Sequence, residues 1–201
     1  TSTDHRSPCG RVSDTVMEQR SAALLNGKYD DEQLGEVVNL AKHHLRRARE
    51  LAQDDLMCLT YIGGAENFAG MQERALHTLQ KVLQRNPASS DAHMNICQVY
   101  AYLGRYDDAR HSIHRASELA PEAGFTQFHS WYQGLVEFLA GNYQSAAPAL
   151  ERHTMSTPEY GLANIFAALC MDALGNLEAA RKYIARAKEH NPQLRPDKAS
   201  G

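Results

Sequence analysis

The chain holds 201 residues, of which 28 are Ala and 21 are Leu, against 7 Val and 5 Ile. This excess of helix formers over β-branched residues predicts an all-helical protein and excludes sandwiches, barrels and parallel sheets. The charged fraction of 22%, the hydrophobic fraction of 43% and the formal net charge of −3 exclude a wholly disordered chain and indicate neither nucleic acid nor an anionic membrane as a partner.

The first residues, 1–12, are expected to form a flexible tail. They contain no apolar run, so they do not indicate a signal peptide, and no later segment holds the roughly 18 consecutive apolar residues of a membrane span. Because the chain does not begin with Met, we interpret it as a processed protein or a fragment of a longer one. Its four cysteines form no C-x-x-C pair, which is typical of reduced thiols in a cytoplasmic protein.

Residues 13–55 are expected to form a divergent first helical hairpin. Its first helix is predicted at 13–26. The turn that follows, 27–31 (GKYDD), resembles the segment 104–108 (GRYDD) later in the chain. A longer second helix is predicted from about 31 to 52.

Three residue types then recur in one register. The glycines of this register are spaced by 34, 37 and 34 residues, and they are Gly70, Gly104, Gly141 and Gly175. An Ala follows each Gly after five residues, and a Pro follows each Gly after seventeen. We therefore expect four repeated units followed by a tail at 195–201. The units are 56–89, 90–123, 127–160 and 161–194.

Each residue of the register has a physical role. Gly ends a first helix, because it adopts a left-handed or tight turn without a Cβ penalty. The Ala lies early in a second helix, where a small side chain lets two helices approach closely. The Pro stops that second helix. Such a helical hairpin cannot bury its own apolar face and must stack on its neighbours. One exception is expected in the third unit, where Pro148 should kink or delay the second helix.

This pattern resembles the tetratricopeptide repeat family, whose unit is a 34-residue helix–turn–helix. The segment 90–123 is the best match, since Ile96, Cys97 and Tyr100 stand where the family has L-G-x-x-Y. The resemblance implies an all-α, right-handed superhelical solenoid of about five hairpins. The sequence departs from the family at Glu66 and Glu137, where a large aromatic side chain is preferred between the paired helices.

In this family the first helix of each unit lines a concave groove, and ligand contacts come mostly from these helices. Here the four first helices contain no Lys or Arg and hold four acidic residues, Glu66, Asp91, Glu137 and Asp172. The groove positions implied by the resemblance, with Asn95 and Tyr132 at the edge, are Phe68, Asp91, Met94, Asn95, Gln98, Tyr102, Phe128, Trp131, Tyr132, Leu135, Phe138, Ile165, Leu169 and Asp172. As alternatives, these aromatic residues pack between units, or residues 1–12 or a second copy fill the groove.

The expected function is a non-catalytic protein–protein interaction module that binds an apolar, partly basic peptide or helix. It resembles helical-repeat segments of bacterial regulators, so it is expected to be a regulatory or dimerising segment of a larger signalling or transcription protein. Neither a nucleic acid nor a membrane is expected as a partner, and a homodimer stays open. The basic cluster Lys42, Arg46, Arg47 and Arg49 is interpreted as a solvated helix face.

The alternative function is an all-helical enzyme or metal-binding protein built on the same hairpins. His77 and His111 share a repeat position, and His114 lies one turn beyond His111, so three imidazoles lie on neighbouring helices. Imidazole is a usual ligand of Zn²⁺, but histidines on second helices are more often solvated. Glu66 and Glu137 stand two units apart, too far for a catalytic carboxylate pair. We therefore expect no metal, no cofactor and no catalytic residues.

Overall fold

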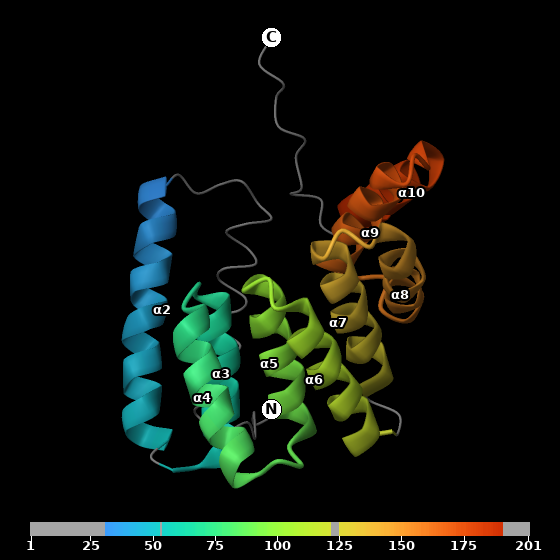
Figure 1. The fold of residues 1–201 in the computed structure, drawn as a ribbon. Helices are drawn as coiled ribbons and strands as arrows, with labels where there is room; N and C mark the ends of the chain where they lie inside the picture. The colour runs from blue at the N-terminus through green and yellow to red at the C-terminus, as the bar shows by residue number, and fades with distance from the viewer. Residues whose placement is uncertain (1–30, 53, 122–124, 191–201) are drawn as a thin grey trace, which may run out of the picture.

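The computed structural model describes residues 31–52, 54–121 and 125–190, and these residues form helices and no strand. In chain order the helices are α2 (Asp31–Ala52), α3 (Leu56–Phe68), α4 (Gln72–Arg85), α5 (Ser90–Tyr102), α6 (Tyr106–Leu119), α7 (Phe125–Leu139), α8 (Tyr143–Ser156), α9 (Gly161–Ala173) and α10 (Leu177–His190). The hairpins α3–α4, α5–α6 and α7–α8 follow one another in a row from α2 to the α9–α10 hairpin (Figure 1). The all-α class and the helical-repeat fold are confirmed.

The four repeat glycines end the first helices α3, α5, α7 and α9. Each of them has a positive φ, between 73° and 78°, as the sequence predicts. In the turn after α3 the backbone N–H of Met71 donates to the carbonyl of Glu66 at 2.9 Å. The N–H of Arg105 donates in the same way to the carbonyl of Tyr100 at 2.8 Å. These bonds close the helix ends, so the glycines set the sharp turn of every hairpin.

The hairpins stack into a solenoid. Each second helix packs on its own first helix and on the first helix of the next hairpin, as in α4 between α3 and α5. Successive first helices α3, α5, α7 and α9 also contact one another, whereas the second helices spread apart. The first helices therefore lie on the inner side of the curve. We call the surface that they form the inner face.

The core runs along the row between the two kinds of helix. The repeat alanines on the second helices, Ala75, Ala109, Ala146 and Ala180, are all buried, which fits their predicted role at close helix contacts. Leu79 on α4 packs with Ile96 and Val99 on α5, and Leu150 on α8 packs with Ala167 on α9. Each hairpin therefore completes the core of the hairpin before it.

Helix α8 corrects one expectation. It begins at Tyr143, the repeat position at which α4, α6 and α10 also begin, and continues through Pro148 to Ser156. The proline therefore does not delay the helix. At residue six of α8 it removes only one backbone N–H, close to the helix start.

Other predictions lie outside the described residues. These are the helix at 13–26 and the tails at 1–12 and 195–201. The long second helix of the first hairpin, predicted from about 31 to 52, is α2. Within the parts that the structure describes, no helix is both long enough and apolar enough for a membrane span.

Candidate functional site

The inner face exposes apolar and aromatic side chains on three consecutive first helices. Four large apolar residues there are exposed, Met57 and Tyr61 on α3, Tyr102 on α5 and Phe128 on α7. The first helices carry no Lys or Arg. An exposed group of large apolar side chains without nearby cations is the kind of surface that proteins use to bind partners.

Two residues predicted for the groove, Asp91 and Tyr102, lie at opposite ends of α5, and a third, Tyr132, lies on the neighbouring helix α7. The pKa of Tyr132 on α7 is raised, first by burial and further by its neighbours Tyr160, Cys97, Tyr102 and Asp91. Burial and Tyr102 also raise the pKa of Tyr160 to about 12. Tyr132 therefore lies within electrostatic reach of Asp91 in the first turn of α5, of Tyr102 at the other end of α5, and of Tyr160, the residue before α9.

Asp91 is the acidic residue of this group. It lies in the first turn of α5 and is exposed. Partial burial of its carboxylate nevertheless raises its pKa above the usual value. A carboxylate that has lost part of its hydration gains from a cationic partner, because the ion pair replaces the missing water.

Trp131, in contrast, belongs to the core. Only 3% of its surface is exposed, against 50% for Phe128 one turn earlier on the same helix. Its ring lies 5.4 Å from that of Tyr160 and 5.5 Å from that of Phe166, both edge to face. Phe138, which is half-buried, lies 5.0 Å from Phe166. Trp131 and Phe138 therefore follow the alternative prediction, in which the aromatic residues pack between units.

Gln98 is also buried, and its side chain accepts a hydrogen bond from the Asn67 amide at 3.1 Å. This bond joins α3 to α5 and satisfies two polar groups inside the solenoid. Leu135 is fully buried as well. The other predicted groove residues are partly or fully accessible. Half-buried are Phe68, Met94, Asn95 and Ile165, and exposed at the end of the row are Leu169 and Asp172.

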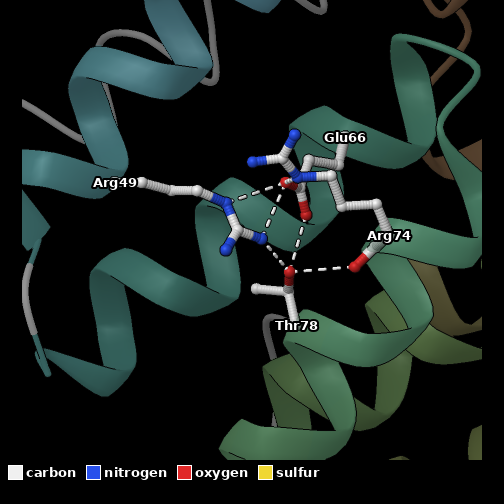
Figure 2. A network of polar contacts seen from close by, with 4 residues as sticks. All are labelled: Arg49, Glu66, Arg74 and Thr78. Atoms are coloured by element: carbon white, nitrogen blue, oxygen red, sulfur yellow. Dashed lines mark hydrogen bonds and ion pairs between the residues drawn. The ribbon is translucent and has the colours of Figure 1, made fainter.

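Glu66 does not lie on the inner face. Its side chain is fully buried between α2 and α4, where it binds two arginines (Figure 2). Nη2 of Arg49 lies 2.7 Å and Nε of Arg74 lies 2.9 Å from Oε1 of Glu66. The Thr78 hydroxyl donates to Oε2 at 2.7 Å and accepts a hydrogen bond from Arg49. The interpretation of Arg49 as part of a solvated basic face is therefore wrong.

Glu137 is held in a similar way by Arg110 on α6. Nε of Arg110 donates to Oε1 at 2.7 Å, and Nη2 donates to Oε2 at 3.0 Å. Asn142 donates to Oε2 at 2.8 Å. The pKa of Glu137 is lowered mainly by the hydrogen bond from Arg110.

These ion pairs change the charge expected of the inner face. The sequence counts four acidic residues on the first helices, but Glu66 and Glu137 are neutralised by arginines of the second helices. Asp91 and Asp172 are left as the accessible acidic groups of the first helices. The arginines face the carboxylates between the helices, so the inner face remains without cations from its own helices.

The sequence reasoning missed Met57 and Tyr61. Both are exposed on α3, at the end of the row nearest the first hairpin. Met57 stands at the repeat position of Asp91 and Phe128, and Tyr61 stands at that of Asn95. The repeat register could therefore have found both residues.

The alternative function, a metal-binding protein or an enzyme, concerns histidines of the second helices. Among the residues described, no three His, Cys, Asp or Glu side chains come together in a way that could hold a metal ion. His77, His111 and His114 are all exposed on second helices. Cys97 and Cys170 are buried free thiols, and burial raises the pKa of Cys97 to about 12, so this thiol stays protonated and unreactive.

The repeat geometry agrees with the comparison with known families. The tetratricopeptide repeat model matches residues 69–128 and 137–198, which is more than half of the chain. The chain belongs to the tetratricopeptide repeat family. None of the curated proteins matches it by sequence.

Solved structures with this fold share little sequence with the chain. A thermophilic protein of the family, TTC0263 from Thermus thermophilus, superposes with a TM-score of 0.66 at 17% identity, covering 90% of this chain and 92% of its own. MamA from Desulfovibrio magneticus RS-1 has a TM-score of 0.58 at 15% identity, covering 92% and 98%. YrrB, described as having an unusual peptide-binding site, has a TM-score of 0.53 at 20% identity, covering 74% and 75%.

Proposed function

We propose that the chain is a non-catalytic interaction module that binds an apolar, partly basic peptide or helix on its inner face. The observation that carries the proposal is the exposure of Met57, Tyr61, Tyr102 and Phe128 on first helices that contain no Lys or Arg. Large side chains of this kind supply most of the binding energy at protein interfaces when a partner covers them.

The chemistry of the partner follows from the same surface. Its apolar side chains would cover Tyr102 and Phe128, and the half-buried Asn95 side chain would bond peptide backbone groups. A Lys or Arg of the partner would bind Asp91, whose pKa is raised by partial burial.

The wider role is proposed on the same basis. A binding surface without a reactive cluster beside it fits a regulatory or dimerising segment of a larger bacterial signalling or transcription protein. The buried free thiols Cys97 and Cys170 fit a reducing, cytoplasmic location. YrrB, which shares the fold, is described as peptide-binding, and this likeness adds support for a peptide ligand.

The test is to select displayed random peptides that bind the purified chain. The affinities of the selected peptides are then measured with labelled copies. We expect peptides that combine aromatic or aliphatic residues with Lys or Arg. Phe128→Ala and Tyr102→Ala should each weaken binding by about tenfold or more, since each removes an accessible anchor. Asp91→Asn should weaken the basic peptides and leave neutral ones unchanged.

Met155→Ala is the matched control. Met155 is exposed on α8, outside the inner face, and truncating it should leave the affinity unchanged. Peptides that bind equally well to Phe128→Ala, Tyr102→Ala and wild-type protein would contradict the proposal. So would a selection that yields predominantly acidic peptides.

A further inference from the structure

The last hairpin exposes apolar positions that every earlier hairpin buries. Ile184 on α10 stands at the repeat position of Leu79, Ile113 and Leu150. It is 37% exposed, while Leu79 and Leu150 are completely buried and Ile113 is 6% exposed. In the earlier hairpins the next first helix covers this position, as α5 covers Leu79. The structure describes no helix in that place after α10.

The same is true of the first helix of this hairpin. Leu169 on α9 is 48% exposed, although its counterparts Gln98 and Leu135 are buried. Together with the exposed Leu177, these residues border a groove of about 520 Å³ between α9 and α10. We call this surface the end groove. It is shaped to receive a helix, because that is what the equivalent surface of each earlier hairpin does.

The charges of the end groove are separated along its length. Asp172 lies in the last turn of α9, next to the hairpin turn, and Lys188 lies in the last turn of α10, at the opposite end of the antiparallel pair. Arg181 lies between them on α10. A two-fold axis through the middle of the groove would bring Asp172 of one copy to Lys188 of the other, twice.

We propose that the end groove is a dimer interface, in which two copies of this chain pack their α9–α10 hairpins against each other about a two-fold axis. The interface buries Leu169, Leu177 and Ile184 of both copies and pairs Asp172 with Lys188 across it. The proposal does not depend on the peptide-binding function, since it uses none of Met57, Tyr61, Tyr102, Phe128 and Asp91, although Leu169 and Asp172 belong to a first helix.

Charge favours this arrangement over a head-to-tail one. In a head-to-tail stack the end groove of one copy would approach the end of the next copy to which α2 belongs, and among the described residues α2 supplies the charges there. The accessible face of α2 carries Lys42, Arg46 and Arg47, which are exposed. These cations would face Arg181 and Lys188, and like charges across an interface oppose association. The two-fold arrangement brings the two Arg181 side chains near the axis, but it also forms two Asp172–Lys188 pairs of opposite charge.

The first experiment is light scattering on the full 201-residue chain during size exclusion, over a wide range of protein concentration. The wild type is expected to show a mass of about twice 22.4 kDa. Ile184→Asp should shift the mass to that of a monomer, because it buries a charge in the interface. Met155→Asp, an equally polar change on α8, should leave the dimer intact. Circular dichroism checks that both variants are folded.

The second experiment tests the two-fold pairing and does not depend on the folding of Ile184→Asp. Asp172→Lys alone and Lys188→Asp alone should each weaken the dimer by about tenfold or more, because like charges then meet twice. Mixing the two variants should restore a dimer, since each opposite pair is re-formed. A monomeric wild type, a dimer that survives Ile184→Asp, or a mixture that stays monomeric would each overturn the proposal. A monomer would mean that another part of the chain, or another protein, covers the end groove.

Discussion

Arg110 and Glu137 form a two-point ion pair across the contact between α6 and α7, with nitrogen–oxygen distances of 2.7 and 3.0 Å. Glu137 is at the repeat position of Glu66, which also binds an arginine of the preceding second helix. The other two units carry Tyr100 and Met171 at this position. Ion pairs and large side chains therefore alternate along the solenoid at one structural position.

The Arg110–Glu137 pair predicts a pH-dependent contribution to stability. Because the pKa of Glu137 is lowered in the folded state, the pair contributes fully above the ordinary Glu pKa and its contribution is lost as the pH falls through the lowered value. Arg110→Met should cost about 1 kcal/mol of unfolding free energy at neutral pH and less in acid. Urea unfolding of both proteins across this pH range measures the difference.

Asp107→Asn is the control for this prediction. Asp107 pairs with the same guanidinium at 2.8 Å, but its side chain is fully exposed. Its removal should change the stability far less than Arg110→Met does. A stability difference between wild type and Arg110→Met that does not shrink in acid would contradict the assignment.

The buried Glu66 predicts a non-additive response to the loss of its arginines. Either Arg49 or Arg74 alone still pairs with the carboxylate, so Arg49→Met or Arg74→Met alone should cost about 1 kcal/mol. The double variant leaves a fully buried carboxylate without a cation and should cost about 3 to 5 kcal/mol. Chemical denaturation of the four proteins gives the coupling energy, and simple additivity of the two losses would contradict this account.

Two glycines inside first helices allow a second helix to pack closely, and this contact can be tested. A Cβ at Gly63 would lie 2.6 Å from Cγ of Leu79, and a Cβ at Gly134 would lie 2.7 Å from Cγ of Leu150. Gly63→Ala and Gly134→Ala should therefore each destabilise the fold by about 1 to 3 kcal/mol, despite the better helix propensity of Ala.

Gly161→Ala is the matched control, because nothing lies within 4 Å of its Cβ and it stands at the start of α9. This change should leave the melting temperature unchanged or raise it. Equal effects of Ala at positions 63 and 161 would show that the close approach of α4 to α3 is not the reason for the glycine.

Peptide binding should itself depend on pH through Asp91. The carboxylate attracts a cation only when it is ionised, and its pKa is raised by partial burial. Affinity for a basic peptide should therefore fall on acidification, beginning above the ordinary range of an Asp side chain. Asp91→Asn should bind more weakly and lose this pH dependence. Fluorescence anisotropy of a labelled peptide measures both, and an unchanged pH profile in the variant would contradict the role of Asp91.

Much of the fold could be predicted because it depends on the spacing of residues that are close in the sequence. The positive φ of Gly70 and the close approach at Ala75 follow from residues within one turn, so the register alone predicts them. The partners of Glu66 could not be predicted in this way. Arg49 lies on another helix, and its reach depends on how α2 packs on α3.

The burial of individual side chains on the inner face could not be predicted from the sequence either. Periodicity places Phe128 and Trp131 on the same side of α7, but only the packing of Tyr160 and Phe166 decides that Trp131 is covered and Phe128 is not. The proposed binding surface therefore omits Trp131, keeps Tyr102 and Phe128, and adds Met57 and Tyr61.

The most direct test of the central claim is a crystal structure of the chain with a selected peptide. The account predicts that the peptide lies along α3, α5 and α7, covers Tyr102 and Phe128, and places a Lys or Arg beside Asp91. A peptide bound to the second helices, or to the end groove with the inner face empty, would contradict it.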